Sequence, residues 1–318
     1  MRAPAIAIVC LALVGACDKG QESAPSRSAP VTTDEAALFK KLPAGANVVF
    51  GGNYMKVQNL MQSELGEALA GMGPGMKEWS ACWVELKDLK LAGSASFGAG
   101  GGQMQTVFTG ATLDDMKKCA DRAGYKSTLD ADGKYLLIEM TTMGQKLEQG
   151  MLQLPGNMIY TRQSMSFGGG AVVVPGSRAE LEGDMAKLAQ GTVLDNKALA
   201  ASVEKVDRTR TFWFAGTAAG TSISDKVGRF HGTFDIASGV AMDVTVQVVD
   251  SNISNQIMET LPQLKKSAAS MPAELRPMLE NLSVARDGDQ IHAKLKLTDS
   301  QVATLMKQLS AFGRAGAL

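Results

Sequence analysis

The sequence of 318 residues predicts an α+β protein in two related halves, with helices packed on one face of an antiparallel sheet. Three observations carry this prediction. Several segments alternate apolar and polar residues, which is typical of strands with one face in water. Between them lie segments with helix caps and with apolar stripes at helical spacing. The order strand, helix, strand, turn and strand occurs twice along the chain.

The chain opens like a secretory signal peptide. A single positive charge at Arg2 precedes an uncharged, largely apolar run that ends at Ala16. A run of about 14 residues is too short for a helix that crosses a bilayer, which needs roughly 20. A charged start, a short apolar middle and small residues before a cleavage site are typical of secretory signals. We therefore interpret residues 1–16 as a signal peptide.

The end of this segment indicates the kind of signal. Val14, Gly15, Ala16 and Cys17 form a motif that resembles the lipobox of bacterial lipoprotein precursors. In such precursors the cysteine thiol receives a diacylglyceryl group, and cleavage then leaves that cysteine at the N-terminus. The resemblance implies that Cys17 is a lipid attachment site; an ordinary cleaved signal is the alternative. Residues 17–30 are then the acylated cysteine and a flexible tether, because Pro, Ser and charged residues dominate there.

The composition of the chain excludes some partners. Lys and Arg together number 32, and Asp and Glu also number 32, so the formal net charge is zero. Nucleic-acid binding needs clustered positive charge, and the sequence contains no basic block. A hydrophobic content of 45% and a mean hydropathy near zero are typical of a globular core. We expect no nucleic-acid partner, and we expect membrane contact through the N-terminal lipid.

Two cysteines, Cys82 and Cys119, lie beyond the tether. In an oxidising envelope compartment an even pair is a disulfide candidate, and two buried free thiols are the alternative. A metal site lacks ligands, because the chain's two histidines, His231 and His292, are distant from both cysteines in sequence. We predict the disulfide and expect no metal and no other cofactor.

Alternation is clearest in residues 229–236, 239–250 and 289–297. One-faced alternation favours an antiparallel sheet, because parallel strands are usually covered on both faces. The residues assigned to the outward face are His231, Thr233, Asp235, Asp243, Thr245, Gln247, His292, Lys294 and Lys296. If the three strands are neighbours, these side chains form one polar patch that suits a polar partner. A solvated sheet face without a partner is the simpler interpretation.

Helices are indicated by their starts and by their apolar stripes. A capping box at Thr112–Asp115 predicts a helix over 112–123, and Thr298–Gln301 predicts another near the C-terminus. Ile253, Ile257, Leu261 and Leu264 recur at helical spacing, which indicates a helix packed on the core.

A repeat is indicated by the order of these elements. Residues 103–140 contain a strand, a capped helix, a strand, a DADG turn and a strand, and residues 239–297 repeat this order with an RDGD turn. We therefore divide the chain into two halves, residues 31–192 and 193–318. The two halves either share one continuous sheet or form separate sheets. The stretch LPAGANVVFGGNYMKV, residues 42–57, also resembles the start of bacterial lipoproteins of duplicated α+β build. That resemblance implies the fold and no activity.

Three motifs have simpler interpretations than a functional site. TLDADGKYLLIE, residues 128–139, has acids at several EF-hand positions, but Asp-Gly between strand-like runs favours a hairpin without metal. The glycine run at 98–102 precedes a strand instead of a helix, which favours a hairpin loop over a phosphate cradle. Ser202 and Lys205 match a serine–lysine acyl-enzyme pattern, yet the SDN and KTG elements of those families are missing.

The methionine-rich residues 140–165 are assigned to no helix or strand. We interpret their methionines as gap-filling core residues, with an adaptable apolar surface as the alternative.

These features favour a lipid-anchored envelope protein with its domain in the periplasm and a non-catalytic binding or scaffolding role. The sequence shows no convergent cluster of His, Cys and acidic residues, and this favours a binding role over an enzyme. The candidates for binding a partner, such as another envelope protein, are His231, Asp235, His292, Lys294 and Lys296. The alternatives are a carrier of a lipid or other apolar ligand, and an envelope hydrolase with a dispersed site. The anchoring membrane is the inner or the outer one.

Overall fold

The computed structural model describes residues 33–53, 75–86, 89–98, 101–142, 145–166, 172–218, 221, 224–236, 239–268, 276–302 and 304. The predicted signal peptide at 1–16, Cys17 and the tether at 17–30 lie outside the described residues. So does most of the helix predicted to follow Thr298.

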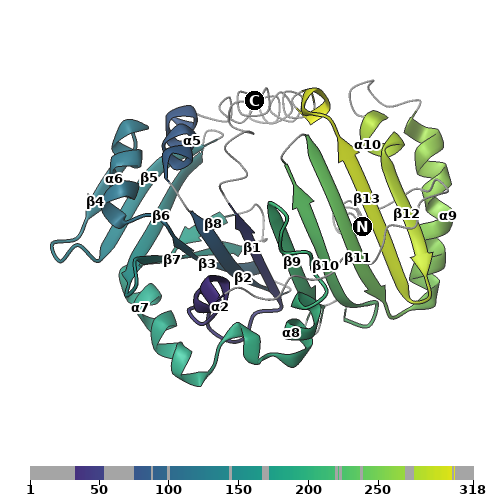
Figure 1. Cartoon of the computed structure of the whole chain (residues 1–318), viewed down its shortest axis with the longest axis horizontal. Coiled ribbons are helices and arrows are strands. Elements are labelled where there is room, and N and C mark those ends of the chain that lie inside the picture. Colours follow the sequence, from purple (N-terminus) through teal and green to yellow (C-terminus); the bar gives the residue numbers. More distant parts are fainter. Residues whose placement is uncertain are drawn as a thin grey trace.

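Among the described residues, thirteen strands form one antiparallel sheet (Figure 1). They are β1 (Val48–Asn53), β2 (Lys90–Gly98), β3 (Gly101–Thr109), β4 (Lys126–Leu129), β5 (Tyr135–Thr142), β6 (Gln145–Leu154), β7 (Met158–Ser166), β8 (Val172–Pro175), β9 (Phe212–Thr217), β10 (Val227–Asp235), β11 (Val240–Val248), β12 (Leu282–Asp287) and β13 (Gln290–Leu297). The order across the sheet is β12-β13-β11-β10-β9-β1-β2-β3-β7-β6-β5-β4, and β8 pairs with β7. The predicted α+β class with an antiparallel sheet is confirmed.

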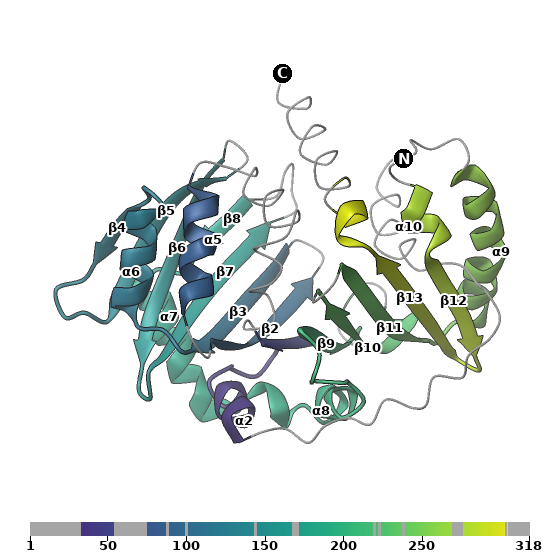
Figure 2. The same ribbon diagram turned by 45° about the horizontal axis from the view of Figure 1, so that its top comes forward.

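Helices cover both faces of the sheet (Figure 2). One face, called the α8 face, carries α2 (Thr33–Phe39), α7 (Arg178–Lys187) and α8 (Lys197–Val203), with the 3-10 turns η2 (Leu188–Gln190) and η3 (Val193–Asp195). The other, called the α9 face, carries α5 (Met76–Glu85), α6 (Leu113–Arg122), α9 (Ser251–Ser267) and α10 (Arg276–Glu280). The expectation that helices pack on one face alone is wrong. The central strands carry apolar side chains on both faces, so both need cover.

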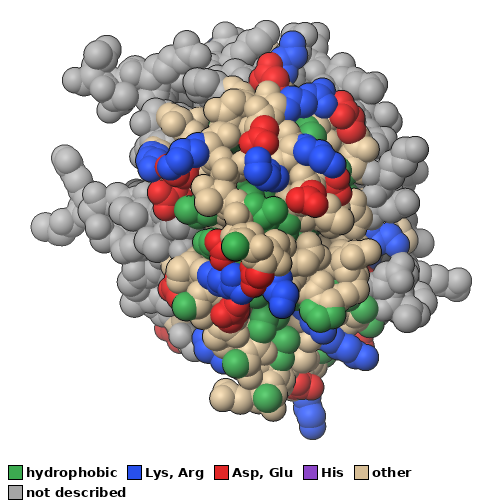
Figure 3. Space-filling view, turned by 90° about the vertical axis from the view of Figure 1, so that its left-hand side faces the viewer, with side chains coloured by type: hydrophobic (Ala, Val, Ile, Leu, Met, Phe, Trp, Pro, Cys, Tyr) green, Lys and Arg blue, Asp and Glu red, His purple; other side chains and the backbone are tan. Residues whose placement is uncertain are grey.

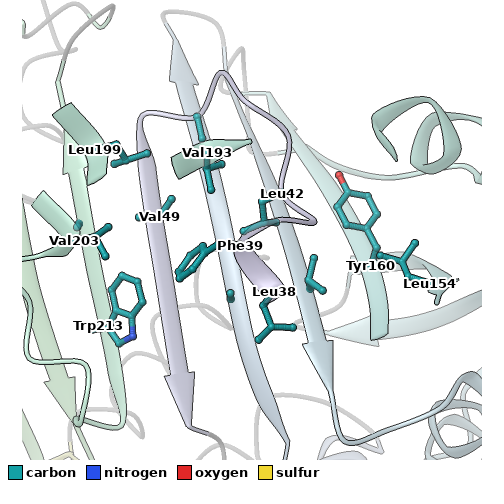
Figure 4. Close-up of a cluster of buried hydrophobic side chains, with 14 of the residues drawn as sticks. Leu38, Phe39, Leu42, Val49, Leu154, Tyr160, Val193, Leu199, Val203 and Trp213 are labelled. Carbon is teal, nitrogen blue, oxygen red and sulfur yellow. The ribbon is translucent and has the colours of Figure 1, made fainter. Parts of the chain in front are cut away.

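The core on the α8 face lies between the central strands and the helices α2 and α8 (Figure 4). Phe39 of α2 packs on Trp213 of β9 with ring centroids 5.7 Å apart, and both side chains are buried. Val49 of β1 is fully buried beside them. Each such side chain stabilises the fold by about 1.5–3 kcal/mol through removal of apolar surface from water. This core joins residues from both halves of the sequence.

The core on the α9 face contains the predicted disulfide. Cys82 of α5 and Cys119 of α6 are bonded, with their Cα atoms 5.4 Å apart. The predicted capping box is also confirmed, since Thr112 and Asp115 hold each other's backbone N–H groups at the start of α6. Trp83 of α5 packs on Phe108 of β3 with centroids 5.6 Å apart. The disulfide therefore fixes two helices that already share one cluster of apolar side chains.

The sheet is continuous across the boundary that the sequence places at residues 192 and 193. β1 of the first half pairs with β9 of the second, and Phe50 lies opposite Phe214 in that pair. The helices before these strands, α2 and α8, are each seven residues long. Their first residues, 33 and 197, are separated by the same 164 positions as the first residues of β1 and β9, 48 and 212.

Phenylalanine rings lie over glycines of neighbouring strands on the α9 face. These Phe–Gly pairs are Phe50–Gly93, Phe97–Gly102, Phe212–Gly52, Phe214–Gly232 and Phe230–Gly216. A Cβ atom at any of the five glycines would overlap with the ring of its partner. Glycine is therefore required for the close approach of the ring. The five phenylalanines form an aromatic band that is half-buried, and Phe97 is 40% exposed.

Two stretches singled out in the sequence are hairpins. Residues 128–139 span the end of β4, a turn and most of β5, as the hairpin interpretation predicts. The methionine-rich stretch, whose pattern did not plainly predict a helix or a strand, falls mostly on β5, β6 and β7. Its strands show no clean alternation because each runs from a covered region to an uncovered one, which leaves polar residues on both faces. Met151 is buried in the α9-face core.

Of the helices that the structure describes, none has the length and hydropathy needed to cross a lipid bilayer.

Candidate functional site

The predicted partner-binding residues lie on the α8 face of the sheet. His231 and Asp235 are on β10, and His292, Lys294 and Lys296 are on β13. β11 lies between these two strands and pairs with both. The three strands are thus neighbours, and their outward residues share one face.

Contacts divide these five residues into two groups. His292 shares a hydrogen bond of 3.0 Å between its Nδ1 and the Thr245 hydroxyl, and Lys294 pairs with Asp243 at 3.1 Å. Asp235 sits at the end of β10, where its carboxylate accepts a hydrogen bond of 2.6 Å from the Thr211 hydroxyl. It also forms an ion pair with Arg210 at 3.3 Å. Asp235 therefore fixes the chain that enters β9, apart from the other four residues.

His231 lies in a depression that sequence reasoning did not predict. The depression has a volume of about 300 Å³, including space open to solvent, and it lies between the end of α8 and strands β10, β11 and β13. Its lining residues are Ser202, Lys205, Arg229, His231, Thr245, Gln247 and Gln290. Alternation identified His231, Thr245 and Gln247 as outward, but it carried no signal for Arg229 or Gln290 or for the end of α8 beside them. We call this depression the α8 pocket.

The α8 pocket combines basic groups with no acidic lining residue. Lys205 and Arg229 both line it, and within the described residues neither forms an ion pair with a carboxylate. Arg229 contacts only the amide oxygen of Gln247, at 3.5 Å. Some arginines elsewhere are neutralised; Arg178, for example, contacts Asp130, Asp132 and Glu182. Two unneutralised cations on one pocket make its potential positive.

Charged side chains at another part of the surface are paired, in contrast to those of the α8 pocket. At the end of the molecule that carries β4 and α6, basic and acidic side chains are interspersed (Figure 3). Lys126 and Lys146 both pair with Glu139 there, and Arg122 pairs with Glu85 at 2.7 Å. Charges at that end neutralise one another, while those of the α8 pocket do not.

The pKa of His231 is lowered from its ordinary value. Burial is the main cause, because the half-buried imidazole loses hydration that would stabilise its charged form. The positive charges of Lys205 and Arg229 and the neighbouring His292 act in the same direction, and Asp243 opposes them. Burial and the neighbouring positive charges therefore both favour the neutral form of the His231 ring.

Known proteins give limited help with this site. No protein-family model matches the chain, and no curated protein is detectably similar to it in sequence. Crystal forms III and I of TP0453, a Treponema protein, are similar in structure, with TM-scores of 0.47 and 0.46 and identities of 12% and 10%. Each alignment covers 86% of this chain, and 98% and 97% of those chains.

The serine and lysine of the acyl-enzyme pattern both line the α8 pocket. The Ser202 hydroxyl donates a hydrogen bond of 3.1 Å to the carbonyl of Ala198 in the preceding turn of α8. Lys205 is joined to Ser202 through its backbone N–H at 3.2 Å. Among the described contacts, none links the hydroxyl to the ammonium group. An activated nucleophile needs that link to a base, so this arrangement favours binding over acyl transfer.

The acidic residues of the EF-hand-like stretch are engaged elsewhere. Asp130 and Asp132 accept hydrogen bonds of 2.8 Å and 2.6 Å from Arg178. Glu139 pairs with two lysines, which hold the pKa of its carboxyl at about 2. In the described parts of the chain, no three His, Cys, Asp or Glu side chains are placed to hold a metal ion.

Proposed function

We propose that this chain is a lipid-anchored envelope protein that binds a polar partner through the α8 face of β10, β11 and β13, without catalysis. The binding surface consists of the α8 pocket together with His292, Lys294 and Lys296. The observation that carries the proposal is the pair of cations, Lys205 and Arg229, that face one pocket without a carboxylate. A partner with negative charge complements these two cations electrostatically.

The lipid anchor rests on the lipobox-like motif that ends at Cys17. Cells that receive a labelled fatty acid are expected to label the wild-type protein. The Cys17→Ser variant should carry no label and keep the size of the precursor, because acylation precedes cleavage. Cys10→Ser is the matched control, since Cys10 lies within the signal peptide, and it should label normally. A labelled Cys17→Ser protein would contradict the anchor.

The partner surface is tested by reversing its exposed charge. Lys294→Glu together with Lys296→Glu should reduce crosslinking of a photoreactive residue on β13 to its partner in intact cells. The free energy of unfolding should fall by less than about 1 kcal/mol, because the Lys294–Asp243 pair is half-exposed. Crosslink yield and thermal melting measure the two effects.

A charge-matched control separates this surface from net charge. Lys117→Glu with Lys118→Glu makes the same charge change on α6, where both lysines pair with acids of their own helix. This control should crosslink like the wild type. Equal crosslinking by both double variants would remove the α8 face from consideration. A loss of several kcal/mol in the Lys294→Glu, Lys296→Glu variant would mean that the face is buried.

We also infer that the chain arose by duplication, with halves related by a pseudo-twofold axis near the Phe50–Phe214 pair. The distance in sequence from the start of α2 to the start of β1 equals the distance from the start of α8 to the start of β9, and this supports the duplication. So does the order β3, α6, β4 and β5 in one half and β11, α9, β12 and β13 in the other. In each half the helix lies on the α9 face, and a hairpin forms the outer edge. β6 and β7 then form an insertion between β3 and β5 in the first half.

One observation favours a second candidate function, the carriage of an apolar ligand. The aromatic band places five part-exposed phenylalanine rings on the α9 face, and two of them, Phe214 and Phe230, have ring centroids 6.4 Å apart. Contiguous exposed apolar surface commonly marks a ligand or partner site. The charge-reversal experiment distinguishes the two functions, because the aromatic band lies on the opposite face and an apolar ligand would be retained by the Lys294→Glu, Lys296→Glu variant.

A further inference from the structure

We propose that the α8 pocket binds a compact oxyanion with the chemistry of phosphate, held by Lys205, Arg229 and His231. This inference rests on the proposed function, because it names the ligand class of the same surface. The charges of the pocket and the residues at matching positions in the other half support it.

The matching positions follow from the spacing of the two halves. A shift of 164 positions superimposes α2 on α8 and β1 on β9, as their bounds show. It matches Leu38 with Ser202, and Lys41 with Lys205. It also matches Phe50 with Phe214, the two residues that face each other across the central strand pair.

The strand residues of the pocket are matched through their cross-strand partners. Phe50 lies opposite Gly93 of β2, and Phe214 lies opposite Gly232 of β10. The residues before these two glycines, Ala92 and His231, therefore occupy matching positions. On the following strand, Val107 pairs with Ala92, and Thr245 pairs with His231. The α8 pocket thus occupies the place where the first half has a core.

That core is apolar and fully packed. Leu38, Ala92 and Val107 are 2%, 0% and 0% exposed and belong to the cluster on the α8 face. Their counterparts in the second half carry a hydroxyl, an imidazole and a hydroxyl. Polar groups at positions that an apolar core can fill lower stability unless they gain partners. In the folded chain the Ser202 hydroxyl bonds to the carbonyl of Ala198 and the Thr245 hydroxyl bonds to His292, so the imidazole of His231 and the two cations are the groups that a ligand can partner.

The groups around the pocket fit an oxyanion. The guanidinium of Arg229 is a planar donor that matches two oxygens of a phosphate, and the ammonium of Lys205 adds a compact positive charge. Gln290 lines the same depression and carries an amide donor, while the amide of Gln247 donates to Asp289 at 2.8 Å. The depression is open to solvent, so an ion can reach these groups from outside.

Oxyanion binding through His231 depends on pH. The groups that face this imidazole are Lys205 beyond the end of α8, Arg229 on its own strand, Asp243 on β11 and His292 on β13. Without a ligand, burial and the neighbouring cations favour the neutral ring. A bound anion favours the protonated ring instead, so binding takes up a proton and the affinity rises as pH falls.

Calorimetric titration of the full-length lipidated protein in nonionic detergent tests the site. Inorganic phosphate should bind the wild type, and Arg229→Gln and Lys205→Gln should each weaken it by about tenfold, the usual effect of losing one charge-assisted hydrogen bond. Lys41→Gln is the matched control, because Lys41 is the counterpart of Lys205 in the half without a pocket. Equal affinity in all four proteins, or no binding to the wild type, would overturn the proposal.

Sulfate is the probe for the pH arm, because its own charge is constant in this range. Sulfate affinity should be several-fold higher at about pH 6 than at about pH 8 in the wild type. His231→Ala, which installs the residue of the first half, should abolish that difference. A wild-type affinity that does not change with pH would overturn the role of His231.

A final arm identifies the source of the oxyanion. Glycerophosphoglycerol, the soluble headgroup of an anionic phospholipid, is titrated beside inorganic phosphate. Tighter binding of the headgroup assigns the site to lipid, and tighter binding of phosphate assigns it to the free ion. Oxyanion binding without partner crosslinking contradicts the partner surface alone, and crosslinking without oxyanion binding contradicts the oxyanion site alone.

Discussion

Removal of the disulfide by Cys82→Ala with Cys119→Ala is expected to lower the free energy of unfolding by about 4 kcal/mol. The bond joins residues that are 37 positions apart, so its loss returns considerable conformational freedom to the unfolded chain. Urea unfolding monitored by tryptophan fluorescence measures the change, because Trp79 and Trp83 lie on α5, one of the two bonded helices.

Two comparisons support that measurement. The wild type treated with reductant after unfolding should refold to a stability close to that of the double alanine variant. The oxidised protein should weigh two hydrogen atoms less than the reduced one by intact mass. Two thiols that react in the native, unreduced protein would contradict the bond.

Loss of the buried carboxylate of Asp184 should destabilise the first half by about 3–5 kcal/mol. Asp184 on α7 is fully buried and accepts hydrogen bonds from the Tyr160 hydroxyl at 3.1 Å and from Arg162 at 3.3 Å. Lys187 approaches its second oxygen at 2.7 Å. Asp184→Ala leaves the guanidinium of Arg162 without a buried counter-charge, which is the costly part of the change. Chemical denaturation measures the loss.

A second variant on the same helix provides the reference. Glu182 also pairs with an arginine, but its side chain is 53% exposed. Glu182→Ala should therefore cost less than about 1 kcal/mol, as exposed ion pairs usually do. Similar losses in both variants would contradict the importance of the buried network. The position of the pKa of Tyr160 provides a further check, because burial and the charge of Asp184 both raise it in the wild type.

Local signals predicted the elements of this fold better than their assembly. The alternation of residues 239–250 and the capping box at Thr112 lie within single segments, and both predictions are confirmed. We did not predict the helices on the α8 face, because a strand needs helices on both of its faces only where it becomes central in the sheet. Val49 and Phe50 point to opposite faces of β1, and a short run of such residues carries no clear period.

In the candidate site, too, local patterns predicted single elements but not how those elements come together. The period of two placed His231 and His292 on one face, which the pairing of β10, β11 and β13 bears out. Lys205 lies two residues beyond the end of α8 and more than twenty positions before β10, and no local pattern links it to these strands. The 164-residue spacing of the halves was the available signal, and five identities in the twenty residues from 34 to 53 were too few to reveal it.

The Phe–Gly pairs have a consequence for how such a long sheet finds its alignment during folding. A slip of one residue between two strands exchanges their faces, so burial rejects it. A slip of two residues keeps every side chain on its own face, and burial alone does not penalise it. Two such slips would set the Phe50 ring over Leu91 or Ala95 in place of Gly93. The glycines therefore discriminate between alignments that hydrophobicity treats as equal, at the four strand pairs on which the centre of the molecule depends.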